Sequence, residues 1–455
     1  MDPTLTLSSS RKPEGQGRWL LVLLFGSVSI GFFLLSMYWP EKAAPQPARA
    51  KVYLIGLDGA SWNLIDPLLQ QGKLPHFRRL MERGAYGPLK TFKPTISPIL
   101  WTTIATGKTY EKHGIGNFTA EMNGKRVPIS SMVRATKAYW NILSDYGIRV
   151  GVVNWWVTWP PDKINGFVVS DRFREKKYKN QRDLTYPPEL ADQLPTIRMS
   201  EAEFARERRK FGLPENMHPA ASSPAIENLV SHYKGFWVQD KLVRESSAQL
   251  LKTRDVDVYG VVFRIVDVSS HLFWMYLDLD LIKEMRAKTA SGAPLSEPDR
   301  ARIDAAYAKV LEPVYKYADQ ILGDFMRVAG TDPTIIVCSD HGFKFDDGRY
   351  GHNDLNVPPD GVLILSGPEF RSGFQIRNAS LYDITPTLLY LEGIPAGRDM
   401  DGRPLFAAIK PEFMRGHPVT VVASHDKGFR QKGKPASSDM DKEILEDLKS
   451  LGYIH

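Results

Sequence analysis

The run Lys51-Val-Tyr-Leu-Ile-Gly-Leu57, followed at once by Asp58-Gly59, decides the fold of this chain. The run is short and almost continuously apolar, without the alternation of a strand that has one face in water. Such a pattern is typical of a strand buried on both faces of a parallel sheet. Similar runs at Val150–Val153, Val258–Val262 and Thr334–Cys338 predict further strands of the same sheet.

Helical stretches lie between these runs, for example at Leu74–Arg83 and Asp304–Val328. This alternation predicts an α/β fold with a doubly wound, mainly parallel sheet. In such folds, sites form at the carboxyl ends of the strands. Asp58, Asp267 and Asp340 each follow a strand-like run, so we expect the three carboxylates to share one edge of the sheet.

Composition sets the class of protein. The chain has 455 residues, 43% of them hydrophobic and 24% charged, which is enough for a large core and excludes bulk disorder. The net charge of +7 favours an anionic substrate or an anionic membrane surface. No zinc-finger spacing, RNA-binding signature or long Lys/Arg run is present, which argues against a nucleic-acid-binding module. The sequence does not fix the oligomeric state.

The single cysteine, Cys338, excludes an intramolecular disulfide. It lies in the strand-like run Thr334–Cys338, where we expect it to act as a small buried hydrophobe. Any metal site in this chain is therefore expected to use histidine and carboxylate ligands.

Residues 19–39, from Trp19 to Trp39, form an uncharged stretch dominated by Leu, Val, Phe and Ile. A helix of this length spans about 30 Å, the hydrocarbon thickness of a bilayer. Arg11, Lys12 and Arg18 precede the stretch, so residues 1–18 are expected to be a cytoplasmic tail. These features predict a single-pass membrane protein with its main domain on the extracytoplasmic side, which is periplasmic if the source is a bacterium.

A cleaved signal peptide is the alternative, since Ala48-Arg49-Ala50 has the small-x-small form. The apolar run is too long for a usual signal peptide, which favours an uncleaved anchor. The remaining chain divides into parts with different compositions. We expect a linker at 40–50, a main domain at 51–416 with an inserted cap at 119–254, and a C-terminal tail at 417–455.

The tail is expected to end in a short amphipathic helix. Ser438 and Asp441 suggest its cap, and Gly452 its end. The apolar positions that follow the cap have helical spacing: Ile444, Leu445, Leu448 and Leu451. Within the predicted cap, the Trp155–Trp159 cluster is expected to pack in a core.

Six short segments carry side chains suited to metal chemistry. They supply three aspartates, three histidines and one hydroxyl, enough for two divalent cations with open positions for water or substrate. The candidate metal ligands are Asp58, Ser97, Asp267, His271, Asp340, His341 and His352. Ser97 is also the candidate nucleophile, and because no Gly-x-Ser-x-Gly elbow surrounds it, metal coordination is the expected way to activate its hydroxyl.

At these residues the chain resembles the alkaline phosphatase superfamily, specifically its type I phosphodiesterase / nucleotide pyrophosphatase branch. The resemblance covers about Lys51 to Leu405. The motifs that carry it are Leu57-Asp58-Gly59, the block from Pro94 through Ser97, Trp101 and Thr106-Gly107 to His113-Gly114-Ile115, Ser339-Asp340-His341-Gly342-Phe343, Tyr382 to Leu388 and Met400 to Leu405.

The resemblance implies two divalent metal ions, zinc above all. It implies that Asp58, Asp340 and His341 hold one ion, which contacts Ser97. It also implies that the second ion is held by Asp267, His271 and His352. Ser97 would form a covalent phospho-serine. Asn117 falls near the family's phosphate-oxygen donor, although its spacing from His113-Gly114-Ile115 is one residue shorter than in nucleotide pyrophosphatases.

Two departures from the family pattern bear on chemistry. Nucleotide pyrophosphatases have threonine where this chain has Ser97, so Thr95 is an alternative nucleophile. The sulfatase relatives need an arginine shortly after the nucleophile, whereas Ser97 is followed by Pro98-Ile99-Leu100-Trp101. This difference argues against sulfatase chemistry.

The expected function is therefore hydrolysis of phosphate esters by a membrane-anchored, two-metal enzyme. Since no arginine occurs between Arg83 and Arg126, we expect a preference for phosphodiester or pyrophosphate bonds over doubly charged monoesters. Arg172 or Arg174 could reverse that preference by reaching into the site. Phosphomonoesterase, phosphonate hydrolase and phosphotransferase activities are alternatives, and a non-catalytic, membrane-tethered binding protein is the alternative of another class.

Overall fold

The computed structural model describes most of the chain after residue 50. The described residues are 51–173, 180–197, 199–200, 202–204, 206, 224–273, 277–290, 292–346, 349–352, 357–429 and 433–454. Among them, no helix combines the length and apolar character that a membrane span requires. The predicted anchor at 19–39, with its tail and linker, lies outside the described residues.

A ten-stranded sheet forms the centre of the described chain, in the order β13-β2-β12-β9-β1-β8-β5-β6-β7, with β14 paired to β2. Its middle strands, from β9 to β6, run parallel to one another, whereas β12 and β7 are antiparallel to their neighbours. The sheet strands are β1 (Val52–Leu57), β2 (Gly84–Lys90), β5 (Val150–Val153), β6 (Gly166–Val169), β7 (Thr185–Tyr186), β8 (Val258–Phe263), β9 (Thr334–Cys338), β12 (Gly361–Ser366), β13 (Phe374–Gln375) and β14 (Ala379–Ser380).

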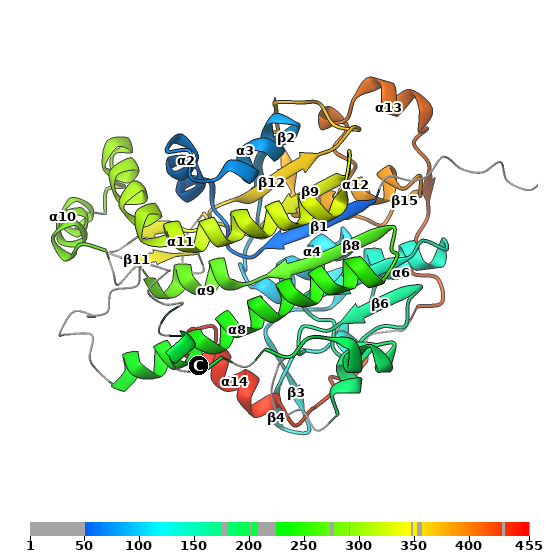
Figure 1. Ribbon diagram of the computed structural model, residues 1–455, viewed down its shortest axis with the longest axis horizontal. Coiled ribbons are helices and arrows are strands. Elements are labelled where there is room, and N and C mark those ends of the chain that lie inside the picture. Colours follow the sequence, from blue (N-terminus) through cyan, green and yellow to red (C-terminus); the bar gives the residue numbers. More distant parts are fainter. Residues whose placement is uncertain are drawn as a thin grey trace, which may run out of the picture. The chain divides into compact units, whose positions relative to one another are not determined.

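Helices cover both faces of this sheet (Figure 1). The larger helices are α2 (Trp62–Gln70), α3 (Pro75–Glu82), α4 (Ser97–Thr106), α6 (Tyr139–Asp145), α8 (Pro224–Thr253), α9 (Ile265–Leu272), α10 (Leu279–Thr289), α11 (Glu297–Ala329), α12 (Ile384–Leu391) and α14 (Asp441–Ser450). Shorter elements are α5 (Tyr110–His113), α13 (Pro411–Gly416), β3 (Thr119–Met122), β4 (Lys125–Pro128), β10 (Lys344–Asp346), β11 (Arg349–Gly351), β15 (Ala396–Gly397) and β16 (Val421–Val422).

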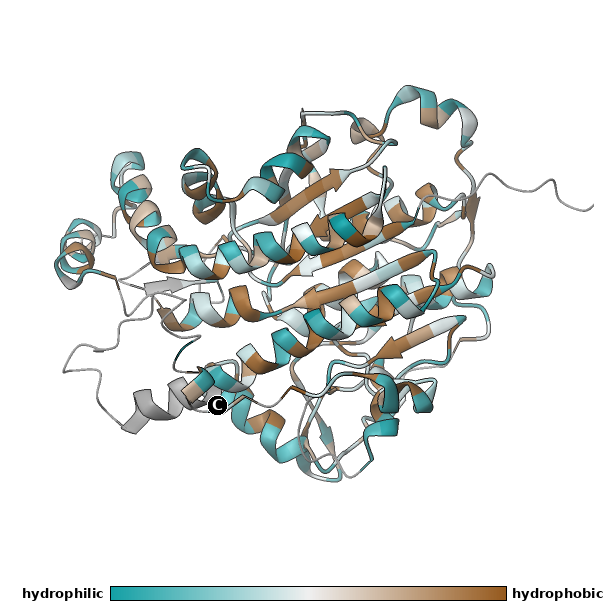
Figure 2. Ribbon diagram, viewed as in Figure 1, coloured by the Kyte–Doolittle hydropathy of each residue, from teal (hydrophilic) through white to brown (hydrophobic). Residues whose placement is uncertain are grey.

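Strand β1 shows why the sheet needs two covering layers. All six of its residues are buried. Tyr53, Ile55 and Leu57 belong to the core that α2, α3, α8, α9 and α11 complete, whereas Val52 and Leu54 belong to the core on the side of α4, α6 and α12. The strands are accordingly hydrophobic along most of their length in Figure 2, and the covering helices have hydrophilic outer faces. The prediction of a mainly parallel α/β sheet is confirmed.

The prediction of an inserted cap at 119–254 is wrong for residues 150–186. This stretch contributes β5, β6 and β7 to the central sheet, with β5 parallel to β8. The physical reason is that Val150–Val153 and Gly166–Val169 are apolar runs, which are buried when β5 pairs with β8 and β6 pairs with β5. The hairpin β3–β4 lies outside the sheet, in contact with α14.

Candidate metal centre

Three aspartates come from three adjacent strands of the sheet. Asp58 follows β1, Asp340 lies two residues after β9, and Asp267 lies in the first turn of α9, just after β8. Because β9, β1 and β8 are parallel neighbours, their carboxyl ends meet at one edge. The three aspartates are 0–1% exposed. The topology thus concentrates three buried carboxylates at a single place.

His341 lies between these carboxylates. Its Nε2 is 3.7 Å from Asp58 Oδ1, 3.7 Å from Asp340 Oδ2 and 3.7 Å from Asp267 Oδ1. A tetrahedral zinc ion with bonds of about 2.0–2.1 Å holds its ligand atoms about 3.4 Å apart. The ligand atoms of Asp58, Asp340 and His341 lie within 4.8 Å of one another, which is a spacing that a metal ion can bridge.

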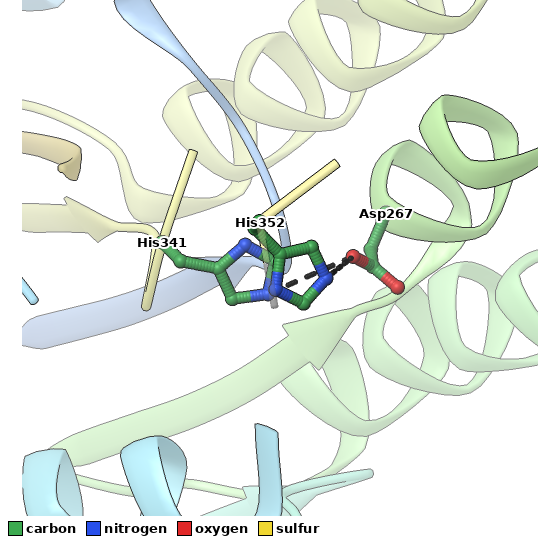
Figure 3. Close-up of side chains that lie close together, drawn as sticks. All are labelled: Asp267, His341 and His352. Atoms are coloured by element: carbon green, nitrogen blue, oxygen red, sulfur yellow. Dashed lines mark ion pairs between the residues drawn. The ribbon is translucent and has the colours of Figure 1, made fainter. Parts of the chain in front are cut away.

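A second group forms around Asp267, with His341 and His352 (Figure 3). His352 Nε2 lies 3.8 Å from Asp267 Oδ1, and the rings of His341 and His352 stack with centroids 3.7 Å apart. His271, one turn after Asp267 on α9, places its Nε2 3.5 Å from Asp267 Oδ1 and 2.9 Å from His352 Nε2. All three residues predicted to hold the second ion are therefore together, and His341 borders both groups.

The hydrogen bonding of these residues fits a metal ion. Asp58 Oδ1, Asp267 Oδ1, Asp340 Oδ2 and His341 Nε2 are buried and have no hydrogen-bond partner among the described residues. Leaving a buried polar atom unpaired costs about 1–3 kcal/mol, and more for a charged group. The Nδ1–H of His341 donates to the carbonyl of Gly342 at 3.1 Å, which leaves Nε2 with a free lone pair. The unpaired atoms are the ones that would bind the cations.

The other carboxylate oxygen of Asp58 is held by two tryptophans. Trp101 Nε1–H donates to Asp58 Oδ2 at 3.1 Å, and Trp156 Nε1–H donates to the same oxygen at 2.9 Å. Two donors on Oδ2 orient the carboxylate so that Oδ1 stays available for a metal. Trp156 packs against the core, as expected of the tryptophan cluster, and its indole N–H serves the metal centre as well.

Glycines permit the close approach of these elements. Gly59 has a φ of +71°, and a Cβ there would lie 2.8 Å from the Cβ of Asp267. A Cβ on Gly56 would lie 2.4 Å from the ring of Trp101. Side chains at either position would push Asp267 or Trp101 away from Asp58.

The electrostatics of the group show uncompensated charge. Burial, reinforced by the charge of Asp267, raises the pKa of Asp58 to about 6. Burial also raises the pKa of Asp267, and burial with the charges of Asp58 and Asp267 raises the pKa of Asp340 well above its ordinary value. The pKa of His352 is lowered by burial and by the neighbouring His341 and His271. Divalent cations would supply the positive charge that this cluster lacks.

Ser97, the predicted nucleophile, is the first residue of α4 and is 1% exposed. Trp101 lies four residues later on the same helix face and bonds to Asp58, so Ser97 lies on the face of α4 that meets the metal centre. A helix N-terminus also stabilises developing negative charge. Thr95, the alternative nucleophile, donates its hydroxyl to the carbonyl of His352 at 3.0 Å.

Asn117 is exposed, unlike the predicted metal ligands. Its side-chain Oδ1 accepts from the backbone N–H of Phe118 at 2.7 Å, which leaves the amide NH₂ as the donor. His113 anchors the loop that carries Asn117. Its Nδ1 accepts from Ile115 N–H at 3.2 Å, and Nε2 faces Thr103 Oγ1 at 3.1 Å. Burial lowers the pKa of His113 to about 3, so the ring stays neutral.

Asp240 of α8 holds the N-terminal end of α9, the helix that carries two predicted ligands. Its carboxylate accepts from the backbone N–H groups of Arg264 and Ile265 at 3.0 and 3.1 Å. The Arg264 guanidinium lies 3.7 Å from the ring centroid of Trp156. Sequence reasoning missed both Asp240 and Arg264, because neither belongs to a motif.

A cavity of about 50 Å³ adjoins the centre. Asp58, Asp267, Arg264 and the C-terminal Tyr453 are among its lining residues. Tyr453 was also missed, since no pattern in the tail marks it as a site residue. Arg172 lines the cavity but is bound to Asp441, and Arg174 lies outside the described residues.

The sequence matches the profile of the type I phosphodiesterase / nucleotide pyrophosphatase family over residues 52–357. No curated protein shows a significant match. Similar solved structures include murine ectonucleotide pyrophosphatase / phosphodiesterase 5, with 12% identity, coverage of 79% of this chain and 100% of that chain, and a TM-score of 0.44.

A phosphonate monoester hydrolase of Agrobacterium radiobacter has 16% identity, covers 81% of this chain and 78% of its own, and has a TM-score of 0.46. A 2-O GAG sulfatase has 12% identity, coverage of 83% and 76%, and a TM-score of 0.47. The family profile spans the residues that build the metal centre, from Asp58 to His352. The chain therefore belongs to the type I phosphodiesterase / nucleotide pyrophosphatase family.

Proposed function

We propose that this protein hydrolyses phosphate esters, with two divalent metal ions, zinc above all, and Ser97 as the nucleophile. The observation that carries the proposal is the set of unpaired, buried ligand atoms on Asp58, Asp267, Asp340 and His341. A binding protein that uses no metal would have no need to keep these atoms directed at one another.

The reaction follows from the positions of the side chains. Bound in these sites, divalent cations would favour ionisation of the serine hydroxyl and offset the negative charge of the phosphate oxygens. Ser97 Oγ would then form a bond to phosphorus while the bond from phosphorus to the ester oxygen breaks, and the leaving oxygen takes a proton. Water would cleave the resulting phospho-serine and restore the hydroxyl. The NH₂ group of Asn117 is the proposed donor to a phosphate oxygen.

We propose phosphodiesters or pyrophosphate-type bonds as the substrates. A monoester carries about two negative charges at neutral pH and a diester about one. The two lysines nearest Ser97 in the following loop are already paired: Lys108 with Asp399 and Asp426 at 2.6 Å each, and Lys112 with Asp401 at 2.5 Å. Neither is free to neutralise the second charge of a monoester.

The test compares kcat/KM on an aryl phosphodiester and an aryl phosphomonoester that share one leaving group. We expect the diester to react with the higher kcat/KM, because the neutral Asn117 suits a singly charged group. Pyrophosphates and phosphonates belong in the same panel. A clear preference for the monoester would reject this choice of substrate.

Arg264 favours a second candidate, a phosphomonoesterase. It lines the same cavity as Asp58 and Asp267, so its guanidinium lies near the metal centre. Arg264→Gln separates the two candidates. In a monoesterase, this change would selectively reduce kcat/KM for the monoester, whereas in a diesterase it would leave the ratio of the two substrates nearly unchanged.

From the apolar residues 19–39 we further propose that the protein is anchored in a membrane with its catalytic domain on the extracytoplasmic side. Protease added to intact cells or spheroplasts from that side is expected to digest the domain, while a cytoplasmic marker protein survives. A domain that resists digestion until the membrane is permeabilised would contradict the proposed orientation.

A further inference from the structure

The C-terminal segment 433–454 packs beside the metal centre, although it lies far outside the matched residues 52–357. Leu448 and Ile454 are buried with Phe118, which is next to Asn117. The start of α14 is tied down by Arg172, whose Nη1 lies 3.1 Å from Asp441 Oδ1. Arg172 is only 3% exposed. This buried ion pair fixes the end of the chain against the catalytic domain.

Tyr453 is the point of contact between this segment and the predicted metal ligands. Its ring stacks on Phe118, with centroids 4.7 Å apart and planes 7° apart. It also meets the ring of His271 edge-on, at 5.2 Å. The Tyr453 hydroxyl donates a hydrogen bond to Asp267 Oδ2. Asp267 Oδ1, the other oxygen, is the one without a partner among the described residues.

The same arrangement occurs at Asp58. There, Trp101 and Trp156 occupy Oδ2 and leave Oδ1 unpaired. Each aspartate thus has one oxygen held by an aromatic donor and the other directed toward His341 Nε2, at 3.7 Å in both cases. A carboxylate held at one oxygen cannot rotate freely, so its second oxygen stays in the position that suits a metal.

We propose that Tyr453 is a positioning residue of the metal centre, which orients Asp267 and so makes the affinity for the second ion depend on the C-terminal segment. The inference rests on the proposed two-metal function and extends it beyond the family's matched residues. A side chain that holds a metal ligand by a hydrogen bond typically contributes about 10–100-fold to metal affinity. The Arg172–Asp441 ion pair supports the same geometry by holding the start of α14.

The test is Tyr453→Phe in the full chain, because this change keeps the stacked ring and removes only the hydroxyl. Zinc binding is measured by competition with a chelator of known affinity, on protein freed of metal. We expect one of the two zinc sites to weaken about 10–100-fold and the other to change little. The melting temperature of the metal-free protein should stay close to that of the wild type.

Tyr390→Phe is the matched control, since the Tyr390 hydroxyl donates to the carbonyl of His417 at 2.7 Å and not to a predicted ligand. It should leave both zinc affinities unchanged. If Tyr453→Phe binds zinc within twofold of the wild type, the inference is overturned while the proposed function stands. Equal weakening of both sites with a lower melting temperature would overturn it too, because the hydroxyl would then act only in packing. A wild type that binds no zinc would overturn both proposals.

Discussion

Asp340→Asn is expected to remove bound zinc and to lower kcat/KM by at least about a thousandfold, which corresponds to about 4 kcal/mol of transition-state stabilisation. Asp340 is fully buried, and its Oδ2 is one of the unpaired ligand atoms. An amide keeps the volume of the side chain but provides a much poorer metal ligand. Metal content by elemental analysis and kcat/KM on the preferred substrate measure the two effects.

Without metal, the stability of the Asp340→Asn protein should not fall in the way that its zinc content and activity do. Asp58, Asp267 and Asp340 repel one another when no cation is present, and their mutual charges are among the causes that raise the pKa of Asp340. Because burial and the charges of Asp58 and Asp267 disfavour an ionised Asp340, replacing it by a neutral amide should not lower the free energy of unfolding of the metal-free protein. Full activity after exhaustive chelation of the wild type would contradict the metal requirement itself.

Asp319→Asn serves as a control, because it is expected to lower stability without removing zinc. Asp319 is also buried, but its carboxylate accepts from the backbone N–H groups of His76 and Phe77 at 2.9 and 3.0 Å. Weakening these bonds should lower the free energy of unfolding by about 1–3 kcal/mol while zinc content stays at the wild-type level. Loss of zinc from both variants would mean that any damage to the buried structure empties the sites.

The strands of the central sheet could be predicted because several of them are unbroken apolar runs. Thr334–Cys338 and Val150–Val153 match β9 and β5 residue for residue, since unbroken apolar runs of this length have few other ways to be buried. The ends of the helices were harder to predict. Helix α11 begins at Glu297, seven residues before the predicted Asp304, because its first turns are polar and carry no apolar stripe. The cap at 119–254 was drawn too wide because the polar segments around β6 and β7 gave no sign that these two strands continue the sheet beyond β5.

The candidate site divides in a similar way. Asp58, Asp267 and Asp340 could be placed together from the sequence, since each follows a strand and parallel strands end at one edge. The side chains that donate hydrogen bonds to these aspartates could not be placed from the sequence. Trp156 and Tyr453 lie 98 and 186 residues away from Asp58 and Asp267, and the pairing of β5 beside β8 and the packing of the C-terminal segment bring them into contact. Local patterns contain no information about such distant pairs.

Ser97→Ala is expected to reduce kcat by at least about a thousandfold, as loss of an essential nucleophile does in other hydrolases. The change removes one oxygen from a buried position at the start of α4, so zinc content and the melting temperature should stay close to the wild-type values. A second readout is the covalent intermediate. Wild-type protein quenched in acid during turnover of a labelled substrate should retain label on Ser97, and the variant should retain none.

Thr95→Val tests the competing hydroxyl. Its Oγ1 donates to the carbonyl of His352, so its loss should weaken the position of a predicted ligand and lower activity modestly, without removing the covalent label from Ser97. The two changes are therefore expected to differ in two ways. Ser97→Ala has the larger effect on activity, and it alone removes the covalent label. An active Ser97→Ala protein beside an inactive, unlabelled Thr95→Val protein would assign the nucleophile to Thr95. In that case Ser97, at the N-terminus of α4, would at most help to bind the phosphate group, and the bond to phosphorus would form two residues earlier in the chain.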